Sequence, residues 1–357
     1  MATPMTAADH ALDERLFRAT VGALELFTIH LGRRLGLYEA LGRTGPMTVA
    51  EVAATCDLDA RYTGEWLEQQ AVAGLLEVDE DAATNEHRFR LPDAHRGVLL
   101  DPEDSAHVAP FADLLVGIAG ALDEVADAFR TGDGVAYERY GPAFRAGQGA
   151  INRPAFLRDL VETWLPAAGL DDHVRRPGAR VADVGTGLGW AAIGVARAHP
   201  DTVVVGVDRD HASIDEARGH ARDAGVHVAF HAEDAGLLPA RGPFDVVLLL
   251  ETLHDLARPV EVLRACRAAL RPDGAVLVAD EAVAERFAAP GDELERMMYG
   301  WSVSHCLPAS RTEAGSAAIG TVIRPGTVRD LAREAGFRGI DTVDVEAGSF
   351  RLYRLDP

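Results

Sequence analysis

The chain has 357 residues, of which 48% are apolar and 25% charged, and its formal net charge is −21. This length favours two domains, and the composition is that of a soluble globular protein. All 35 basic residues are arginine, which excludes lysine Schiff-base chemistry and a Walker lysine, and the acidic balance disfavours nucleic acid as a partner.

The sequence shows neither a membrane-span pattern nor a leader pattern. No apolar run reaches the roughly 18 residues of a transmembrane helix, and no basic segment followed by an apolar block opens the chain. We therefore expect a cytoplasmic protein with no membrane partner. Cys56, Cys266 and Cys306 lie far apart, so neither a disulfide framework nor a zinc knuckle is expected, and the first two are interpreted as small buried residues.

Residues 1–100 predict a winged-helix domain. Apolar residues recur at helical spacing over 11–42, and a capping box beginning at Thr48 opens a short helix. A further helix is expected over 61–76, followed by two extended runs around a polar loop at 79–87. This order of elements is that of a winged helix: a helix, a short helix, a turn, another helix and a two-stranded ribbon.

The charges of this domain argue against DNA binding. Its expected recognition helix carries Glu65 and Glu68 against Arg61, and the wing is rich in Asp and Glu. A phosphate backbone would repel such a surface. We therefore expect a domain that dimerises and forms a wall of the substrate pocket.

A helical region, residues 101–176, is expected between the two domains. An apolar stripe over 108–129 predicts a helix whose apolar face belongs either to a core or to a dimer interface. The glycine-rich stretch at 132–149 is interpreted as a linker from its composition, although it holds more aromatic and amide side chains than a spacer needs. Residues 155–170 predict one more helix.

Strand and helix patterns alternate through residues 177–357. This alternation predicts a Rossmann-like, seven-stranded, doubly wound α/β sheet. The run at 244–250 is almost wholly apolar and is placed at the centre of the sheet, and the last two strands are expected to form an antiparallel hairpin at its edge. The expected strands are 181–184, 203–208, 226–231, 244–250, 275–280, 339–345 and 349–355.

Polar residues follow the apolar runs where the strands end. Ligands of an open α/β sheet bind at this edge. Gly185, Gly187 and Gly189 alternate through a turn that opens a helix, and glycine there permits positive φ and close approach of a ligand. Asp208 ends the next strand, where a carboxylate accepts hydrogen bonds from ribose hydroxyls. The other polar residues at this edge are Asp183, Asp234, Glu251 and His254.

Five segments in order make residues 181–280 resemble the class I S-adenosylmethionine-dependent methyltransferases. They are VADVGTGLG, VVVGVDRD, HAEDAG, FDVVLLLETLHDL and LRPDGAVLVAD. The resemblance implies S-adenosyl-L-methionine as cofactor, with its methionine part on the glycine turn, its ribose at Asp208 and its adenine at Asp234. Glu251 is implied beside the methionine end or the substrate. The implied cofactor-binding residues are Asp183, Gly185, Thr186, Gly187, Gly189, Asp208, Arg209, Asp234, Ala235 and Glu251.

The resemblance extends over nearly the entire chain. Residues 35–79 are similar to the N-terminal dimerisation winged helix of plant-type and bacterial small-molecule O-methyltransferases. This implies a homodimer that acts on a small molecule in secondary metabolism. The segments shared with a bacterial subgroup, mostly of unassigned substrate, are NRP at 152–154, ETLHD at 251–255 and SVSHCLP at 302–308.

The same resemblance implies that His254, paired with Asp255, is the general base. Imidazole, with an unperturbed pKa near ~6.5, can remove a proton from a phenol at neutral pH. This chain departs from the family pattern because Leu256 replaces the tryptophan that follows the pair. A histidine that caps a helix or packs under the cofactor is the alternative interpretation.

The insertion between the fifth and sixth strands is expected to cover the methyl acceptor, with a buried helix end as the alternative. The candidate substrate-binding residues are Tyr299, Trp301, His305 and Cys306 in this insertion, and Tyr140 in the linker. Tyr140 and Asn152 of the linker are also expected to close over the cofactor. No metal is expected, because His, Asp and Glu residues lack ligand spacing. In particular, the adjacent residues His254 and Asp255 are not expected to face one ion.

The sequence therefore predicts methyl transfer from S-adenosyl-L-methionine to a small molecule, most simply to a hydroxyl oxygen. A transcriptional regulator that senses the cofactor through its winged helix is one alternative, which the acidic surface disfavours. An enzyme that keeps the cofactor but catalyses a cyclisation or another reaction without methyl transfer is the second. The cofactor motifs leave that second alternative open.

Overall fold

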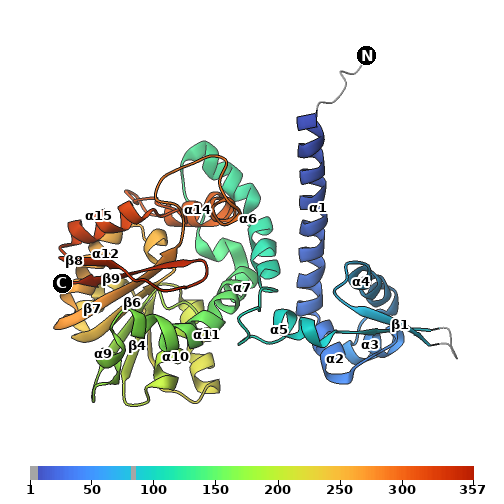
Figure 1. Cartoon of the computed structure of the whole chain (residues 1–357), viewed down its shortest axis with the longest axis horizontal. Coiled ribbons are helices and arrows are strands. Elements are labelled where there is room, and N and C mark those ends of the chain that lie inside the picture. Colours follow the sequence, from blue (N-terminus) through green and yellow to red (C-terminus); the bar gives the residue numbers. More distant parts are fainter. Residues whose placement is uncertain (1–6, 82–85) are drawn as a thin grey trace. The chain divides into compact units, whose positions relative to one another are not determined.

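The computed structural model describes residues 7–81 and 86–357, which divide into two compact units. The first unit contains the described residues up to Gly117 and also Ala146–Ile151, and the second contains Ile118–Arg145 and Asn152–Pro357. Figure 1 traces the elements of both units. Among the described helices, none has the length and apolar character needed to cross a bilayer.

The first unit has the predicted winged-helix order. Thr48 Oγ1 accepts a hydrogen bond from Glu51 N at 3.3 Å, and the Glu51 carboxylate accepts one from Thr48 N at 2.8 Å, so the predicted capping box is confirmed. The elements are α1 (Ala7–Arg34), α2 (Leu37–Thr44), α3 (Val49–Cys56), α4 (Ala60–Val72), β1 (Glu77–Asp81), β2 (Glu86–Arg90), η1 (Asp93–His95) and α5 (Arg96–Leu99). Strands β1 and β2 pair antiparallel as the predicted ribbon.

One expectation for this unit is refined and one needs correction. The helical stretch expected over 11–42 consists of two helices, α1 and α2, because Gly36 between them takes a left-handed conformation with φ 71°. Cys56 is half-buried, not buried, because it lies at the end of α3. The core of this unit is formed by Leu37, Tyr38, Leu41, Met47, Val52, Trp66, Leu67, Leu76, Phe89, Leu91, Leu99 and Ala109.

The glycine-rich stretch at 132–149, which was interpreted as a linker, is largely helical and closely packed. Its glycines allow close packing: a Cβ on Gly134 would lie 2.3 Å from the backbone nitrogen of Thr312, and one on Gly147 would meet backbone at 3.0 Å. The elements of this region are α6 (Phe111–Thr131), the 3-10 helix η2 (Tyr137–Tyr140), α7 (Gly141–Pro154), the π-helix η3 (Ala155–Trp164), α8 (Leu165–Ala167) and α9 (Asp171–Arg175).

The second unit contains the predicted seven-stranded sheet, with strand order β5-β4-β3-β6-β7-β9-β8. Strands β3 to β7 run parallel, and β9 pairs antiparallel with both β7 and β8, which confirms the predicted edge hairpin. The strands are β3 (Arg180–Val184), β4 (Val203–Asp208), β5 (Ala229–Ala232), β6 (Phe244–Leu250), β7 (Leu270–Glu281), β8 (Gly339–Thr342) and β9 (Phe350–Asp356).

Helices cover both faces of this sheet, as the doubly wound prediction requires (Figure 1). Successive strand residues point to opposite faces: Val181 packs in one apolar core with α10 and α11, and Ala182 in a second core with α12 and α15. The remaining helices are α10 (Trp190–Ala198), α11 (His211–Asp223), η4 (Ala235–Ala240), η5 (Leu253–Asp255), α12 (Pro259–Ala268), α13 (Glu293–Trp301), the π-helix η6 (Ser302–Cys306), α14 (Leu307–Ser310) and α15 (Pro325–Ala335).

Several strand boundaries differ from the prediction, and the starts of β5 and β7 have a clear cause. Strand β5 begins at Ala229, three residues later than expected, because Val226 N donates a hydrogen bond to Ala221 O and so closes the turn that follows α11. Strand β7 begins at Leu270, before the expected 275, because Leu270 pairs with Phe244 across a register irregularity.

Candidate active site

The glycine turn joins β3 to α10 and is held by backbone hydrogen bonds. The amides of Gly185 and Thr186 donate to Val207 O at 2.9 and 3.1 Å. A Cβ on Gly185 would lie 2.4 Å from the side chain of Thr252, and its φ is 71°. Only glycine fits there, and the turn therefore lies directly against the segment that follows β6.

Two carboxylates hold the turn. Asp183, buried in β3, accepts a hydrogen bond from Thr186 Oγ1 at 2.5 Å, and burial raises the pKa of Asp183 to about 6. Asp208, the last residue of β4, accepts from Gly187 N at 2.9 Å and from Asp210 N at 2.9 Å. A carboxylate has about four acceptor sites, so Asp208 retains capacity for ligand hydroxyls.

The predicted residues after β4 and β5 form a more exposed group. Arg209 makes an ion pair with Glu313 and approaches Asp234 at 3.9 Å. Asp234 accepts a hydrogen bond from Gly236 N at 2.7 Å and so caps η4, which begins at Ala235. These side chains lie at the carboxyl edge of the sheet, as predicted, and the contacts they make there hold the loops.

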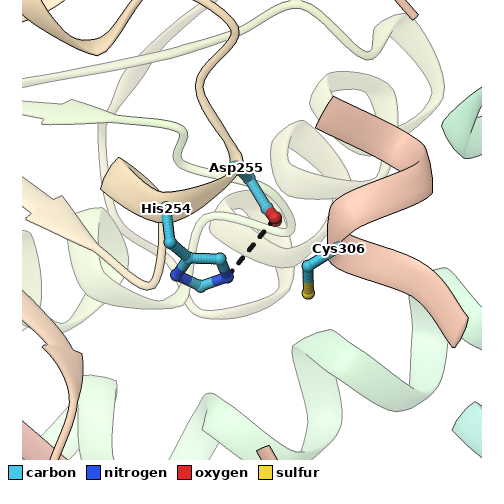
Figure 2. A group of neighbouring side chains, drawn as sticks. All are labelled: His254, Asp255 and Cys306. Carbon is cyan, nitrogen blue, oxygen red and sulfur yellow. Dashed lines mark ion pairs between the residues drawn. The ribbon is translucent and has the colours of Figure 1, made fainter. Parts of the chain in front are cut away.

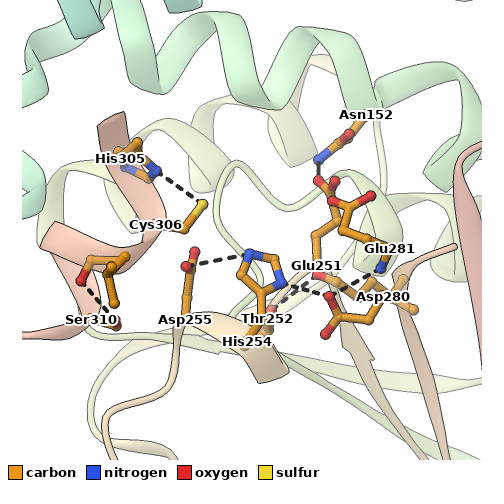
Figure 3. Close-up of polar contacts among 12 residues, drawn as sticks. Asn152, Glu251, Thr252, His254, Asp255, Asp280, Glu281, His305, Cys306 and Ser310 are labelled. Carbon is orange, nitrogen blue, oxygen red and sulfur yellow. Dashed lines mark hydrogen bonds and ion pairs between the residues drawn. The ribbon is translucent and has the colours of Figure 1, made fainter. Parts of the chain in front are cut away.

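Glu251 is the first residue after β6 and has φ 50°, an unusual backbone conformation for a residue with a side chain. Its carboxylate accepts a hydrogen bond from Asn152 Nδ2 and pairs with the carboxyl group of Glu281 (Figure 3). Burial raises the pKa of Glu251, and burial together with the nearby Glu251 raises that of Glu281 well above its usual range. The burial of both groups therefore favours a proton shared between the two carboxyl groups.

His254 lies in η5 between two carboxylates. Its Nδ1 is 2.6 Å from Asp280 Oδ1, and its Nε2 is 3.3 Å from Asp255 Oδ1. Burial alone would lower the pKa of His254, but the negative charges of Asp280 and Asp255 outweigh it and hold that pKa well above its usual value. Because the side chain is only 4% exposed, these charges are poorly screened by water.

Three of the predicted substrate-binding residues lie together beside His254. The ring of Tyr140 is 4.4 Å from that of His305, and Tyr140 OH donates a hydrogen bond to Ser304 O at 3.1 Å. Cys306 Sγ is 3.4 Å from His305 Nδ1 and also contacts His254. Burial lowers the pKa of His305 to about 3 and raises that of Cys306 to about 12, so both side chains are neutral.

The other two predicted substrate-binding residues lie on α13. Tyr299 is partly exposed, and its contacts are with Arg324, which donates to its hydroxyl at 3.2 Å, and with the ring of Phe287. Trp301 is the half-buried last residue of α13. These contacts do not join Tyr299 to the His254 cluster.

One expectation about metals is wrong in its geometry. His254 and Asp255 were not expected to face one ion, but η5 is a tight 3-10 helix that turns both side chains toward Cys306 (Figure 2). One ligand atom from each of these three residues lies within 4.8 Å of the other two.

The sequence predicts that Asn152 closes over the cofactor together with Tyr140, but it assigns no role to Asp280 or Glu281, which complete the cluster. Asp280 and Glu281 end the buried strand β7, and a carboxylate pair after an apolar run at the sheet edge was the signal that could have identified them. Asn152 comes from α7, outside the sheet, and only the folded chain brings it to Glu251.

Two family models match the chain. Residues 175–326 match a methyltransferase domain, and residues 22–100 match an Rv2258c-like winged HTH domain. The predicted class of the catalytic domain and the predicted winged helix are thereby confirmed.

Curated relatives match part of the chain. It is 40% identical over 98 residues to the ubiquinone biosynthesis O-methyltransferase of Roseobacter denitrificans, which is 27% of this chain and 39% of that protein. It is 34% identical over 164 residues to the protein of the same name from Ralstonia nicotianae, which is 44% of this chain and 63% of the relative. The matches thus span less than two thirds of these relatives.

Solved structures share the fold of the whole chain. The mitomycin 7-O-methyltransferase MmcR aligns with a TM-score of 0.69 at 20% identity, over 99% of each chain. Human N-acetylserotonin methyltransferase, in complex with SAM, aligns with a TM-score of 0.67 at 20% identity, over 100% of this chain and 99% of that one. The second unit thus contains a methyltransferase domain with the class I fold, and the first contains an Rv2258c-like winged helix-turn-helix domain.

Proposed function

We propose that this protein transfers a methyl group from S-adenosyl-L-methionine to a hydroxyl oxygen of a small molecule. The observation that carries the proposal is the glycine turn at 185–189 with the Asp208 carboxylate bonded to its central amide, at the carboxyl edge of a methyltransferase domain. The names of the matched relatives, which are O-methyltransferases, support oxygen as the acceptor atom.

The residues of the turn fit the cofactor. Gly185 leaves room that a Cβ would fill, and Asp208 keeps free acceptor positions for the two ribose hydroxyls. We assign the adenine to the edge formed by Asp234 and Ala235, near Arg209. Bound S-adenosyl-L-methionine would supply an electrophilic methyl group on a positively charged sulfur.

The acidic groups beside the turn suit that positive charge. Glu251 follows β6 next to Thr252, which packs on Gly185, and Glu281 lies against Glu251. A nearby cation favours the ionised form of a buried carboxyl group. We therefore expect cofactor binding to lower the pKa of the Glu251–Glu281 pair and to release its shared proton.

His254 is the general base of the proposal. Asp280 accepts the Nδ1 proton of His254, which fixes the ring and leaves Nε2 to receive the proton of the acceptor hydroxyl. The raised pKa of His254 makes the imidazole a stronger base, but a higher pH is needed to deprotonate it so that it can act. Most of the rate enhancement would come from holding oxygen and methyl carbon in line.

The acceptor is assigned to the side of the site formed by Tyr140, His305 and Cys306. His305 and Cys306 are neutral and buried, and the ring of Phe144 lies 4.1 Å from that of His305. Such a wall suits an aromatic or otherwise apolar acceptor that carries a hydroxyl group. That Tyr299 and Trp301 contact the acceptor at the outer part of this side stays a prediction.

The homodimer is also part of the proposal. Helix α1 exposes a stripe of apolar side chains, with Phe17 71% exposed and Leu16 and Leu24 each 59% exposed. Apolar stripes of this length usually pack against a partner, here a second copy of α1. The double variant Leu16→Glu, Phe17→Glu should be monomeric in light scattering where the wild type is dimeric. A cytoplasmic location stays a prediction.

Calorimetry with S-adenosylhomocysteine tests the proposed function. The full chain should bind one equivalent, and Asp208→Asn should weaken binding by roughly 10-fold or more, since a charge-assisted hydrogen bond contributes about 1.5–3 kcal/mol. Absence of binding to the wild type would refute the cofactor assignment. A low-salt mobility-shift experiment addresses the regulator alternative, and tight binding to duplex DNA would favour it.

A further inference from the structure

A second use of the acceptor-side cluster emerges from the atoms that flank His254. His254 Nε2 and Asp255 Oδ1 lie 3.3 Å apart, yet Asp255 Oδ1 is buried and has no hydrogen-bond partner among the described residues. A charged oxygen in that position is costly unless something satisfies it. Cys306 Sγ lies within 4.8 Å of both atoms (Figure 2).

This spacing is that of ligands around one metal ion. Zinc binds imidazole nitrogen and carboxylate oxygen at about 2.0–2.2 Å, so two such ligands at a tetrahedral angle lie about 3.3–3.4 Å apart. The separation of His254 Nε2 and Asp255 Oδ1 matches that edge. The thiol of Cys306, which lies within 4.8 Å of both atoms, would have to move closer to complete the site.

The surroundings of His254 support the same conclusion. Its Nδ1 is hydrogen-bonded to Asp280 Oδ1 at 2.6 Å, and Asp280 is fully buried. A metal-bound histidine almost always donates its other ring proton to such a carboxylate, which orients the ring. Nitrogen, oxygen and sulfur together favour zinc or a similar transition ion over magnesium or calcium, which take oxygen ligands.

We propose that His254, Asp255 and Cys306 form a binding site for one zinc ion. Three protein ligands leave a fourth position open, as in zinc sites that also take water or a substrate oxygen. The zinc ion would occupy Nε2 of His254, the atom to which the proposed function gives the acceptor proton. Zinc should therefore inhibit methyl transfer reversibly, and this consequence, unlike binding itself, rests on the proposed function.

Spectroscopy of the cobalt-substituted full chain tests the site. After treatment with a chelator, the protein should bind one equivalent of Co²⁺ with a thiolate-to-metal charge-transfer band, and Zn²⁺ should displace it. Cys306→Ser should abolish the band. Cys266→Ser is the matched control, because Cys266 is equally buried but lies in α12, and it should leave the band unchanged.

Affinity gives a second measurement that does not depend on turnover. Calorimetric titration with Zn²⁺ should show Asp280→Asn weakening binding by about 10- to 100-fold, the usual effect of losing the carboxylate behind a histidine ligand. Binding of S-adenosylhomocysteine should be the same in wild type and Cys306→Ser. This separates the two proposals, because lost cofactor binding affects only the proposed function.

Two results would overturn the zinc site. One is the absence of stoichiometric Co²⁺ and Zn²⁺ binding to a wild-type protein that still binds S-adenosylhomocysteine and is therefore folded. The other is a charge-transfer band that survives Cys306→Ser or disappears in Cys266→Ser, since the metal would then be held elsewhere.

Discussion

The glycine turn at 185–189 is built from one continuous segment and held mainly by backbone hydrogen bonds, whereas the cluster around His254 is built from several segments and held by side chains. The turn takes its shape from its glycines and from the two carboxylates of Asp183 and Asp208. The cluster needs η5, the end of β7 and η6 to meet. The cofactor side is therefore specified locally, and the acceptor side only by the complete fold.

This difference predicts that the two sides can be damaged separately. The glycine turn should lose cofactor binding when a side chain is added to one of its glycines. The His254 cluster should lose activity when one of its ionisable groups is removed. Each substitution below is chosen to affect one side and to leave the other measurable.

The largest effect is expected for His254→Asn. Removing the base should lower kcat by about 10²- to 10⁴-fold, while the affinity for S-adenosylhomocysteine stays within twofold of wild type. Steady-state kinetics with a hydroxyl-bearing acceptor that the wild type methylates, and calorimetry, measure the two quantities. Unchanged turnover would leave His254 as a packing residue.

Gly185→Val should damage the opposite side. The new side chain would collide with Thr252, because even a Cβ lies 2.4 Å from it, and the φ of 71° disfavours any side chain. We expect the affinity for S-adenosylhomocysteine to fall about 100-fold. Gly225→Ala is the control, since Gly225 also has positive φ (67°) but open space around it, and cofactor binding should survive there.

Asp280→Asn should sharpen the comparison by moving a pH profile. Asp280 raises the pKa of His254, so its loss should lower that pKa. The rate depends on neutral imidazole and rises with pH, so the rising limb of kcat should move about 1–3 units toward acid. If Asp280 had a purely structural role, its substitution would reduce the rate without shifting the rising limb of the pH profile of kcat.

The smallest effect concerns stability and the Glu281 carboxyl group. Its pKa in the folded protein is raised by burial and by Glu251. The stability linked to its proton is complete below the ordinary glutamate pKa and is lost as pH rises through the higher folded value. Glu281→Gln should therefore melt about 2–4 °C higher than wild type at pH 8 but not at pH 4. The exposed residue Glu285 provides a control, and Glu285→Gln should change neither melt.

The same comparison explains how much the sequence could predict. Local sequence patterns predict the cofactor side of the site. An apolar run predicts strand β3, alternating glycines predict the turn after it, and a carboxylate at the end of the next apolar run predicts the role of Asp208. Apolar periodicity also located β6 at the centre of the sheet and the final hairpin at its edge.

The acceptor side could not be assembled in this way. The contact of Asn152 with Glu251 joins residues 99 positions apart, and that of His254 with Asp280 joins residues 26 apart. The same limit applied to 132–149, where glycine composition suggested a linker although Gly134 and Gly147 are packed against backbone. A high glycine content shows that the backbone of a segment can be flexible. Whether the segment is flexible in the folded protein depends on its tertiary contacts.

A crystal structure of the full chain with S-adenosylhomocysteine would test the central claim most directly. Our account predicts the ribose hydroxyls on Asp208, the homocysteine part along 185–189 and the sulfur facing the side that carries His254. A ligand bound elsewhere, or one whose sulfur is separated from His254 by the sheet, would contradict the account.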